Sequence, residues 1–143
     1  MTDLKRGAIE VTFPSDTHYV HMAINVARNA AVMAGFENSV AGKVAIATDE
    51  AVTNVIKHAY GGKSDKRITL KLVITPESLI INIMHTGKAL TNEDIKLPVM
   101  EEYLKKKKPG GLGLYIMKQF MDEVNYSTGK EHCCQMTKYR KAD

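Results

Sequence analysis

The stretch ATDEAVTNVIKHAYGG places a carboxylate, an amide and an imidazole four residues apart, at Glu50, Asn54 and His58. Residues four apart on a helix are neighbours, so these three side chains would point the same way. An amide oxygen is a hard ligand that suits Mg²⁺, and a carboxylate can accept a proton from an attacking hydroxyl. The spacing therefore suits metal-assisted phosphoryl chemistry. A partly exposed helix flank explains the same residues without any site.

A glycine-rich turn later in the chain is the second candidate. The run PGGLGL contains Gly110, Gly111 and Gly113, and a helical pattern follows it. Glycine lets backbone N–H groups approach an anion closely, and a helix N-terminus adds unpaired donors and a positive dipole end. The turn thus suits phosphate binding. It is neither a Walker A loop nor a dinucleotide fingerprint, because no Gly-Lys-Ser/Thr follows and no strand precedes it.

Four lysines, Lys105–Lys108, lie directly before this turn. One of them would reach a polyphosphate if the segment closes over it, and Lys108 is the nearest in sequence. A solvated charged loop is the alternative.

The elements that must position these residues follow from the hydrophobic pattern. Alternating apolar and polar residues predict five strands, and apolar residues at helical spacing predict three helices. The strands are Ala8–Phe13, Arg67–Thr75, Leu79–Met84, Glu123–Thr128 and His132–Tyr139. The helices run from Ser15 or Asp16 to Gly35, from Asn38 or Ser39 to about Tyr60, and onward from the glycine turn.

The order of these elements indicates the fold class. Residues 86–109 match neither pattern and are expected to form a lid. Strands joined by short turns favour antiparallel pairing. We therefore expect an α+β two-layer sandwich, with a mostly antiparallel mixed sheet and three helices on one face.

The composition is that of one ordinary domain over residues 1–143, with 44% hydrophobic and 25% charged residues. No apolar run approaches the roughly 18 residues of a membrane span, so no membrane partner is expected. The net charge of +4 comes without a base-reading motif, so nucleic acid is not an expected partner. Cys133 and Cys134 are adjacent and cannot staple distant segments, which favours a reducing, cytoplasmic location.

Together, these motifs resemble the anti-sigma factor serine/threonine kinase branch of the GHKL ATPase superfamily, the bacterial sporulation and general-stress switch kinases. ATDEAVTNVIKHAY resembles the N-box of that branch, GGLGLYIMKQFMDEV its second glycine box, and MTKY its final strand. The resemblance covers nearly the whole chain. It implies the Bergerat fold, that of histidine-kinase-like ATPases, with residues 86–109 as the ATP lid.

The resemblance also implies roles for the matching residues. Glu50 resembles the general base, and Asn54 resembles the residue that holds Mg²⁺ on the phosphates of ATP. His58 and Tyr60 complete the wall of the N-box, and Thr137 resembles the threonine that helps to hold adenine. The remaining nucleotide-binding positions are Gly110, Gly111 and Gly113 in the phosphate loop, Lys108 beside them, and His85 and Gly87 after the hairpin.

One position departs from the family pattern. The family has Asp-x-Gly after the hairpin, and its carboxylate accepts from the adenine amino group, whereas this chain has His85-Thr86-Gly87. A neutral imidazole lacks the charge and the second oxygen. Losing a charge-assisted bond costs on the order of 1.5–3 kcal/mol, or roughly 10- to 150-fold in affinity. Three outcomes stay open: weaker binding, a shifted base preference, or loss of nucleotide binding.

The resemblance implies an ATP-dependent protein serine/threonine kinase that is also an anti-sigma factor. Such a protein binds a sigma factor, phosphorylates a STAS-type anti-sigma antagonist and forms a homodimer. The alternative, suggested by His85, is a non-catalytic partner-binding protein of the same fold with weak or altered nucleotide binding. A sensor histidine kinase is not favoured, because no helical phospho-acceptor region precedes the first predicted strand.

Overall fold

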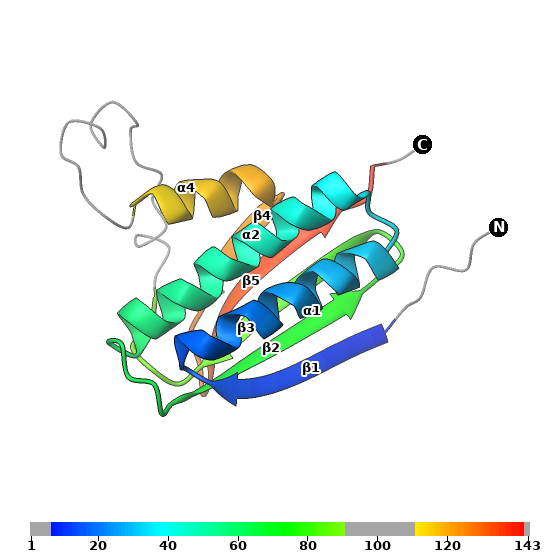
Figure 1. The fold of residues 1–143 in the computed structure, drawn as a ribbon. Helices are drawn as coiled ribbons and strands as arrows, with labels where there is room; N and C mark the ends of the chain where they lie inside the picture. Colours follow the sequence, from blue (N-terminus) through cyan, green and yellow to red (C-terminus); the bar gives the residue numbers. More distant parts are fainter. Residues whose placement is uncertain (1–6, 91–110, 142–143) are drawn as a thin grey trace.

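The computed structural model describes residues 7–90 and 111–141, and these form one five-stranded sheet covered by helices (Figure 1). The order across the sheet is β1-β2-β3-β5-β4. Each strand pairs antiparallel with its neighbour, so the described sheet contains no parallel pair. The strands are β1 (Gly7–Pro14), β2 (Arg67–Ile74), β3 (Ser78–His85), β4 (Glu123–Ser127) and β5 (His132–Tyr139).

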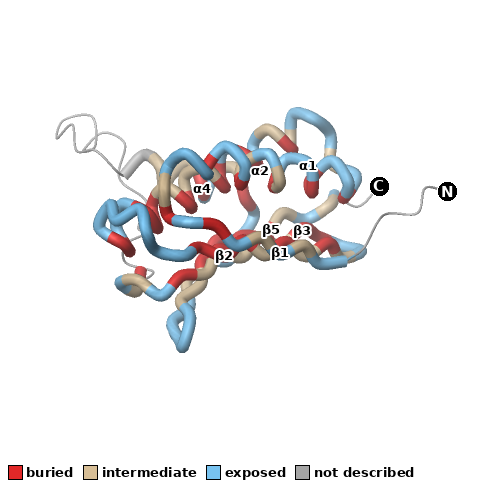
Figure 2. Tube along the Cα trace, turned by 60° about the horizontal axis from the view of Figure 1, so that its bottom comes forward, coloured by how far each residue is buried: buried red, intermediate tan, exposed pale blue. Residues whose placement is uncertain are grey.

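All the described α-helices lie on one face of this sheet (Figures 1 and 2). They are α1 (Val20–Met33), α2 (Asn38–Asn54) and α4 (Gly111–Phe120). The predicted α+β two-layer sandwich is confirmed. The expected lid lies outside the described residues, apart from its first few. None of the helices within residues 7–90 and 111–141 has the length and apolar character needed to span a bilayer.

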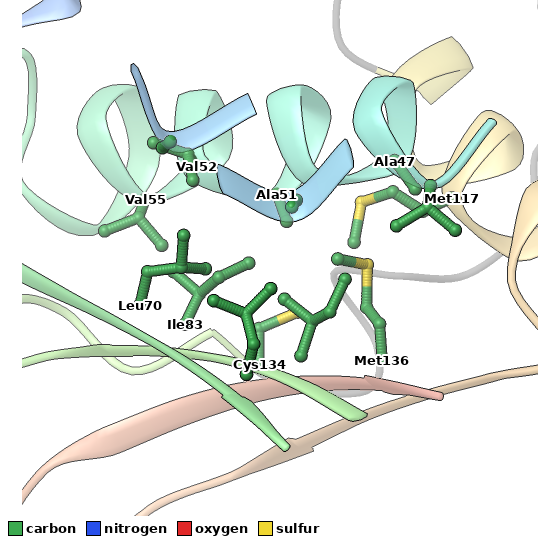
Figure 3. Close-up of a cluster of buried hydrophobic side chains, with 14 of the residues drawn as sticks. Ala47, Ala51, Val52, Val55, Leu70, Ile83, Met117, Cys134 and Met136 are labelled. Atoms are coloured by element: carbon green, nitrogen blue, oxygen red, sulfur yellow. The ribbon is translucent and has the colours of Figure 1, made fainter. Parts of the chain in front are cut away.

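The core lies between the sheet and the helices (Figures 2 and 3). Side chains alternate between the two faces of a strand, and the inward set of β2 and β3 is almost completely buried. The helices pack small residues against these inward side chains, and the small residues let the helix backbones approach the sheet and each other. The inward residues of these two strands are Ile68, Leu70, Leu72, Ile74, Leu79, Ile81 and Ile83, and the helix residues above them include Ala23, Ala27, Ala47, Ala51 and Val55.

Side-chain hydrogen bonds hold the connections that precede α1 and β2. Asp16, a predicted cap, accepts from the backbone N–H of His18 and begins a short 3-10 turn (Thr17–Tyr19) before α1. Ser15, the other predicted cap, bonds instead to a segment distant in sequence: its Oγ donates to the carbonyl of Lys63, 2.5 Å away. The loop before β2 is therefore tied to the end of β1.

The second helix differs from its prediction at its C-terminal end. The regular α-helix ends at Asn54, and the turn Val55–Ala59 is π-helical. The backbone N–H of Tyr60 donates to the carbonyl of Val55 at 2.9 Å, five residues back. A π-turn inserts one extra residue into the helical repeat, so side chains beyond it are rotated away from the line that they would follow on an α-helix.

Candidate functional site

The three polar residues spaced four apart, Glu50, Asn54 and His58, lie in three different environments. Glu50 is half-buried, Asn54 is 8% exposed, and His58 is exposed. His58 lies inside the π-turn, so its side chain no longer follows the direction of the first two. The structure therefore brings Glu50 and Asn54 together, facing α4, and separates His58 from them.

Glu50 meets the first turn of α4 at Gly113. A Cβ atom placed on Gly113 would lie 2.3 Å from Oε2 of Glu50, so the missing side chain is what allows the carboxylate to sit there. Burial raises the pKa of Glu50, and the neighbouring Asp49 carboxylate raises it further. A carboxylate with a raised pKa is a stronger base. Gly111 begins α4, whereas Gly110 and Lys108 lie outside the described residues.

Asn54 packs against the middle of the same helix. Its Nδ2 donates to Sδ of Met117 at 3.8 Å, and Met117 is fully buried in the core beneath α2 (Figure 3). The contact uses the nitrogen end of the amide. It leaves Oδ1, the atom that could ligate a hard cation, without a hydrogen bond from any described residue.

The segment after β3 is anchored to the end of the π-turn. The backbone N–H of Lys88 donates to the carbonyl of Ala59 at 2.8 Å. A Cβ atom on Gly87 would lie 2.4 Å from that carbonyl oxygen and 2.7 Å from Cδ1 of Tyr60. The Tyr60 hydroxyl accepts from the N–H of Thr86 at 2.9 Å and donates to the carbonyl of Arg67 at 2.5 Å. Gly87 thus fits a space in which no side chain can be placed.

His85 ends β3 in a buried position, with 2% exposure. Its Nδ1 accepts from the backbone N–H of Gly87 at 3.2 Å. Its ring meets Tyr60 edge-on, with centroids 5.8 Å apart, and tilts against His132 at 5.4 Å. Burial, followed by the nearby His132, lowers the pKa of His85 to about 4. His85 is therefore neutral at pH 7.

His132 is the residue that sequence reasoning missed. It begins β5 and pairs directly with His85 across the sheet. Cys134 and Met136 on the same strand are buried toward the helices, so the alternation places His132 on the helix side as well. The alternation along β5 would identify His132 only together with the strand register. That register appears only in the folded sheet.

Thr137 is placed apart from the other candidates. It follows Met136, which faces the helices, so the alternation turns Thr137 to the opposite face of the sheet. It pairs with Ile80 on β3 and Glu123 on β4. The structure thus groups Glu50, Asn54 and Gly113 at one position and His85, Gly87 and His132 at another, both on the helix side, and leaves Thr137 behind them.

The buried histidine predicts a dependence of stability on pH. Between pH 6.5 and about 4, His85 binds a proton in the unfolded chain but not in the folded one. Its contribution is complete above the unfolded pKa and is lost as pH falls through this window. We expect the free energy of unfolding to fall by about 2 kcal/mol from pH 7 to pH 5, measured by urea denaturation.

The control for this prediction is His85→Asn, which should flatten the pH dependence. The raised pKa of Glu50 acts in the opposite direction, because the folded state then holds its proton more tightly. An identical pH dependence in His85→Asn would show that other groups are responsible.

Comparison with known proteins covers most of the chain. Residues 13–138 match the family model described as the histidine kinase-like ATPase domain. A serine-protein kinase RsbW from Listeria monocytogenes serotype 4a is 29% identical over 135 residues, 92% of this chain and 86% of that protein. Proteins of the same name from Oceanobacillus iheyensis and Bacillus velezensis are 28% and 25% identical, with 92% of this chain and 85% and 84% of theirs covered.

Proposed function

This chain belongs to the histidine kinase-like ATPase domain family, and we propose that it is an ATP-dependent protein serine/threonine kinase that is also an anti-sigma factor. The kinase proposal rests on the close approach of the Glu50 carboxylate to Gly113. The buried amide of Asn54 lies beside them. A base and a hard oxygen ligand there lie next to a helix N-terminus rich in glycine. The relatives named as serine-protein kinases support the same reading.

In the proposed reaction, Glu50 takes the proton from a serine or threonine hydroxyl of the protein substrate. The hydroxyl oxygen forms a bond to the γ-phosphorus, the bond from that phosphorus to the bridging oxygen breaks, and ADP leaves. The backbone N–H groups around Gly111 and Gly113 hold the phosphates, and Gly110 and Lys108, which precede them in the sequence, are proposed to do the same.

Mg²⁺ fits the same position. Within the described ranges, no three His, Cys, Asp or Glu side chains gather to hold a metal ion, so Oδ1 of Asn54 would share the ion with phosphate oxygens. When bound there, Mg²⁺ would neutralise charge on the phosphates.

The partners in this proposal are a sigma factor and a STAS-type anti-sigma antagonist, with the chain acting in the cytoplasm as a homodimer. The first helix exposes large apolar side chains, among them Met22 at 43% and Met33 at 42%, and a second copy would cover part of this surface. Light scattering on the purified chain measures the mass. A monomer at micromolar concentration would remove the dimer from the proposal.

The kinase assignment is tested by incubating the chain with Mg·ATP, or Mg·GTP, and a STAS-type antagonist from the same organism. Mass spectrometry should show one added phosphate on a serine or threonine of the antagonist. Absence of transfer from either nucleotide at millimolar concentration would overturn the kinase assignment.

A second candidate is a non-catalytic partner-binding protein, and the buried neutral His85 favours it. It predicts that calorimetry detects no nucleotide binding at micromolar concentration, while the sigma factor or antagonist still binds. Micromolar affinity for any nucleoside triphosphate would argue against it.

Gly113→Ala separates catalysis from stability. The added methyl group displaces Oε2 of Glu50, which is the end of a flexible side chain, and alanine is favoured over glycine in a helix by up to about 1 kcal/mol. We expect thermal stability within about 1 kcal/mol of wild type, but phosphate transfer lower by roughly 100-fold, because the base is misplaced.

The same substitution made in a Glu50→Ala background is the control, since no carboxylate remains to be displaced. It should lower transfer little further. Full activity in Gly113→Ala would mean that the position of the carboxylate in the structure does not matter for transfer.

A further inference from the structure

Two imidazole nitrogens at the end of β3 and the start of β5 lack a hydrogen-bond partner among the described residues. Nδ1 of His132 is buried and unpartnered. His85 is 2% exposed, and its Nδ1 accepts the hydrogen bond from Gly87, so Nε2 makes no hydrogen bond to a described residue. The two residues pair directly across neighbouring strands, and their ring centroids are 5.4 Å apart. Buried polar groups nearly always have partners, so the unpartnered Nδ1 of His132, on the strand beside His85, indicates a place for a polar ligand.

The hydrogen bond from Gly87 fixes the tautomer of His85. A backbone N–H can only donate, so Nδ1 must present its lone pair. The lowered pKa keeps the ring neutral at pH 7. The single proton of a neutral imidazole is then on Nε2, which makes Nε2–H a donor.

Tyr60, which packs against His85, supplies no acceptor in its place. Tyr60 meets it edge-on, and the hydroxyl of Tyr60 is already used by Thr86 and Arg67. His132 carries no negative charge. Where a carboxylate would accept from an amino group, this chain therefore presents a hydrogen-bond donor.

We propose that His85 and His132 make this site prefer a purine with an oxygen at position 6, as in guanine and hypoxanthine, over adenine. The inference rests on the proposed nucleotide-binding function. Nε2–H of His85 donates to the oxygen at position 6, and Nδ1 of His132 accepts from N1–H, which only the 6-oxo bases carry. Adenine in the same orientation places its amino group opposite Nε2–H and its unprotonated N1 opposite Nδ1 of His132, so a donor faces a donor and an acceptor faces an acceptor.

Calorimetry of the full chain with the Mg²⁺ complexes of ITP, GTP and ATP tests the preference. ITP is the sharpest probe, because it differs from ATP only in the oxygen at position 6 and the proton on N1. A matched hydrogen bond against a donor facing a donor typically changes affinity by tenfold or more. We expect ITP to bind at least about tenfold more tightly than ATP, with GTP on the side of ITP.

His85→Asp should reverse the order, since a carboxylate accepts from the adenine amino group and repels the oxygen of ITP. His21→Asp is the matched control: His21 is exposed on α1, and the same change of type and charge there should leave the ratio unaltered. His132→Ala, a second variant with no added charge, should lower ITP affinity more than ATP affinity. Circular dichroism checks that each variant is folded.

The outcomes separate this inference from the proposed function. ATP binding as tightly as ITP, or more tightly, overturns the base preference and leaves the nucleotide site standing. Absence of binding for all three nucleotides at millimolar concentration removes both. A folded His85→Asp variant with the wild-type ratio overturns the role of His85.

Discussion

Replacing Glu50 with glutamine is expected to lower phosphate transfer by roughly 100- to 10,000-fold, the contribution typical of a positioned general base. The amide keeps the shape of the side chain and its place beside Gly113, but it cannot take a proton from the attacking hydroxyl. Nucleotide affinity and the free energy of unfolding should stay close to wild type. Single-turnover transfer to the antagonist measures the first quantity, calorimetry the second, and urea denaturation the third.

Glu37→Gln is the matched control for this substitution. Glu37 is exposed at the N-terminus of the same helix, and its side chain makes no capping hydrogen bond. The same change of charge there should leave transfer unaltered. If Glu50→Gln retains more than about a tenth of wild-type transfer, Glu50 is not the base, and the raised pKa of its carboxyl reflects burial alone.

Gly87→Ala is expected to destabilise the fold by about 2–4 kcal/mol. The added Cβ would lie 2.4 Å from the carbonyl oxygen of Ala59 and 2.8 Å from its carbonyl carbon. Both are backbone atoms of the π-turn, so no flexible side chain can move out of the way. Separation of the two segments also breaks the hydrogen bond from Lys88 to Ala59. The midpoint of urea denaturation measures the loss.

Gly42→Ala provides the comparison, because Gly42 is in α2 and nothing lies within 4 Å of its added Cβ. That substitution should be neutral or stabilising by up to about 1 kcal/mol. A Gly87→Ala variant within about 0.5 kcal/mol of wild type would show that β3 and the π-turn are not packed as closely as the structure places them.

The regular elements were predictable from sequence because each depends on local periodicity. Alternation in β2 and helical spacing in α1 are properties of neighbouring residues, and both elements formed within a residue or two of the predicted bounds, apart from the 3-10 turn before α1. The π-turn at Val55–Ala59 was not predictable in this way. It arises because hydrogen bonding shifts to the fifth preceding residue, as from Tyr60 to Val55, and the periodicity of the apolar residues does not register that shift.

The candidate site was only partly predictable, for a related reason. Glu50 and Asn54 share one helix, so their proximity follows from spacing. The contact of Glu50 with Gly113 and the pairing of His85 with His132 join distant segments. On β5, a difference of one residue decides which face a side chain occupies. Thr137, which the motif match selected, is five residues from His132, so the two side chains lie on opposite faces, and the register shows that His132 is the one beside His85.

The strand order β1-β2-β3-β5-β4 also has a consequence for how the protein acquires its site during synthesis. β2 and β3 form a hairpin that can close as soon as it is made, but His85 meets its partner only when β5, near the end of the chain, inserts between β3 and β4. Contacts between segments so far apart in sequence form late and slowly. A nascent chain on the ribosome will therefore carry α2 with Glu50 and Asn54 well before His85 and His132 can pair, and a truncation before His132 would yield a chain that lacks half of the histidine pair.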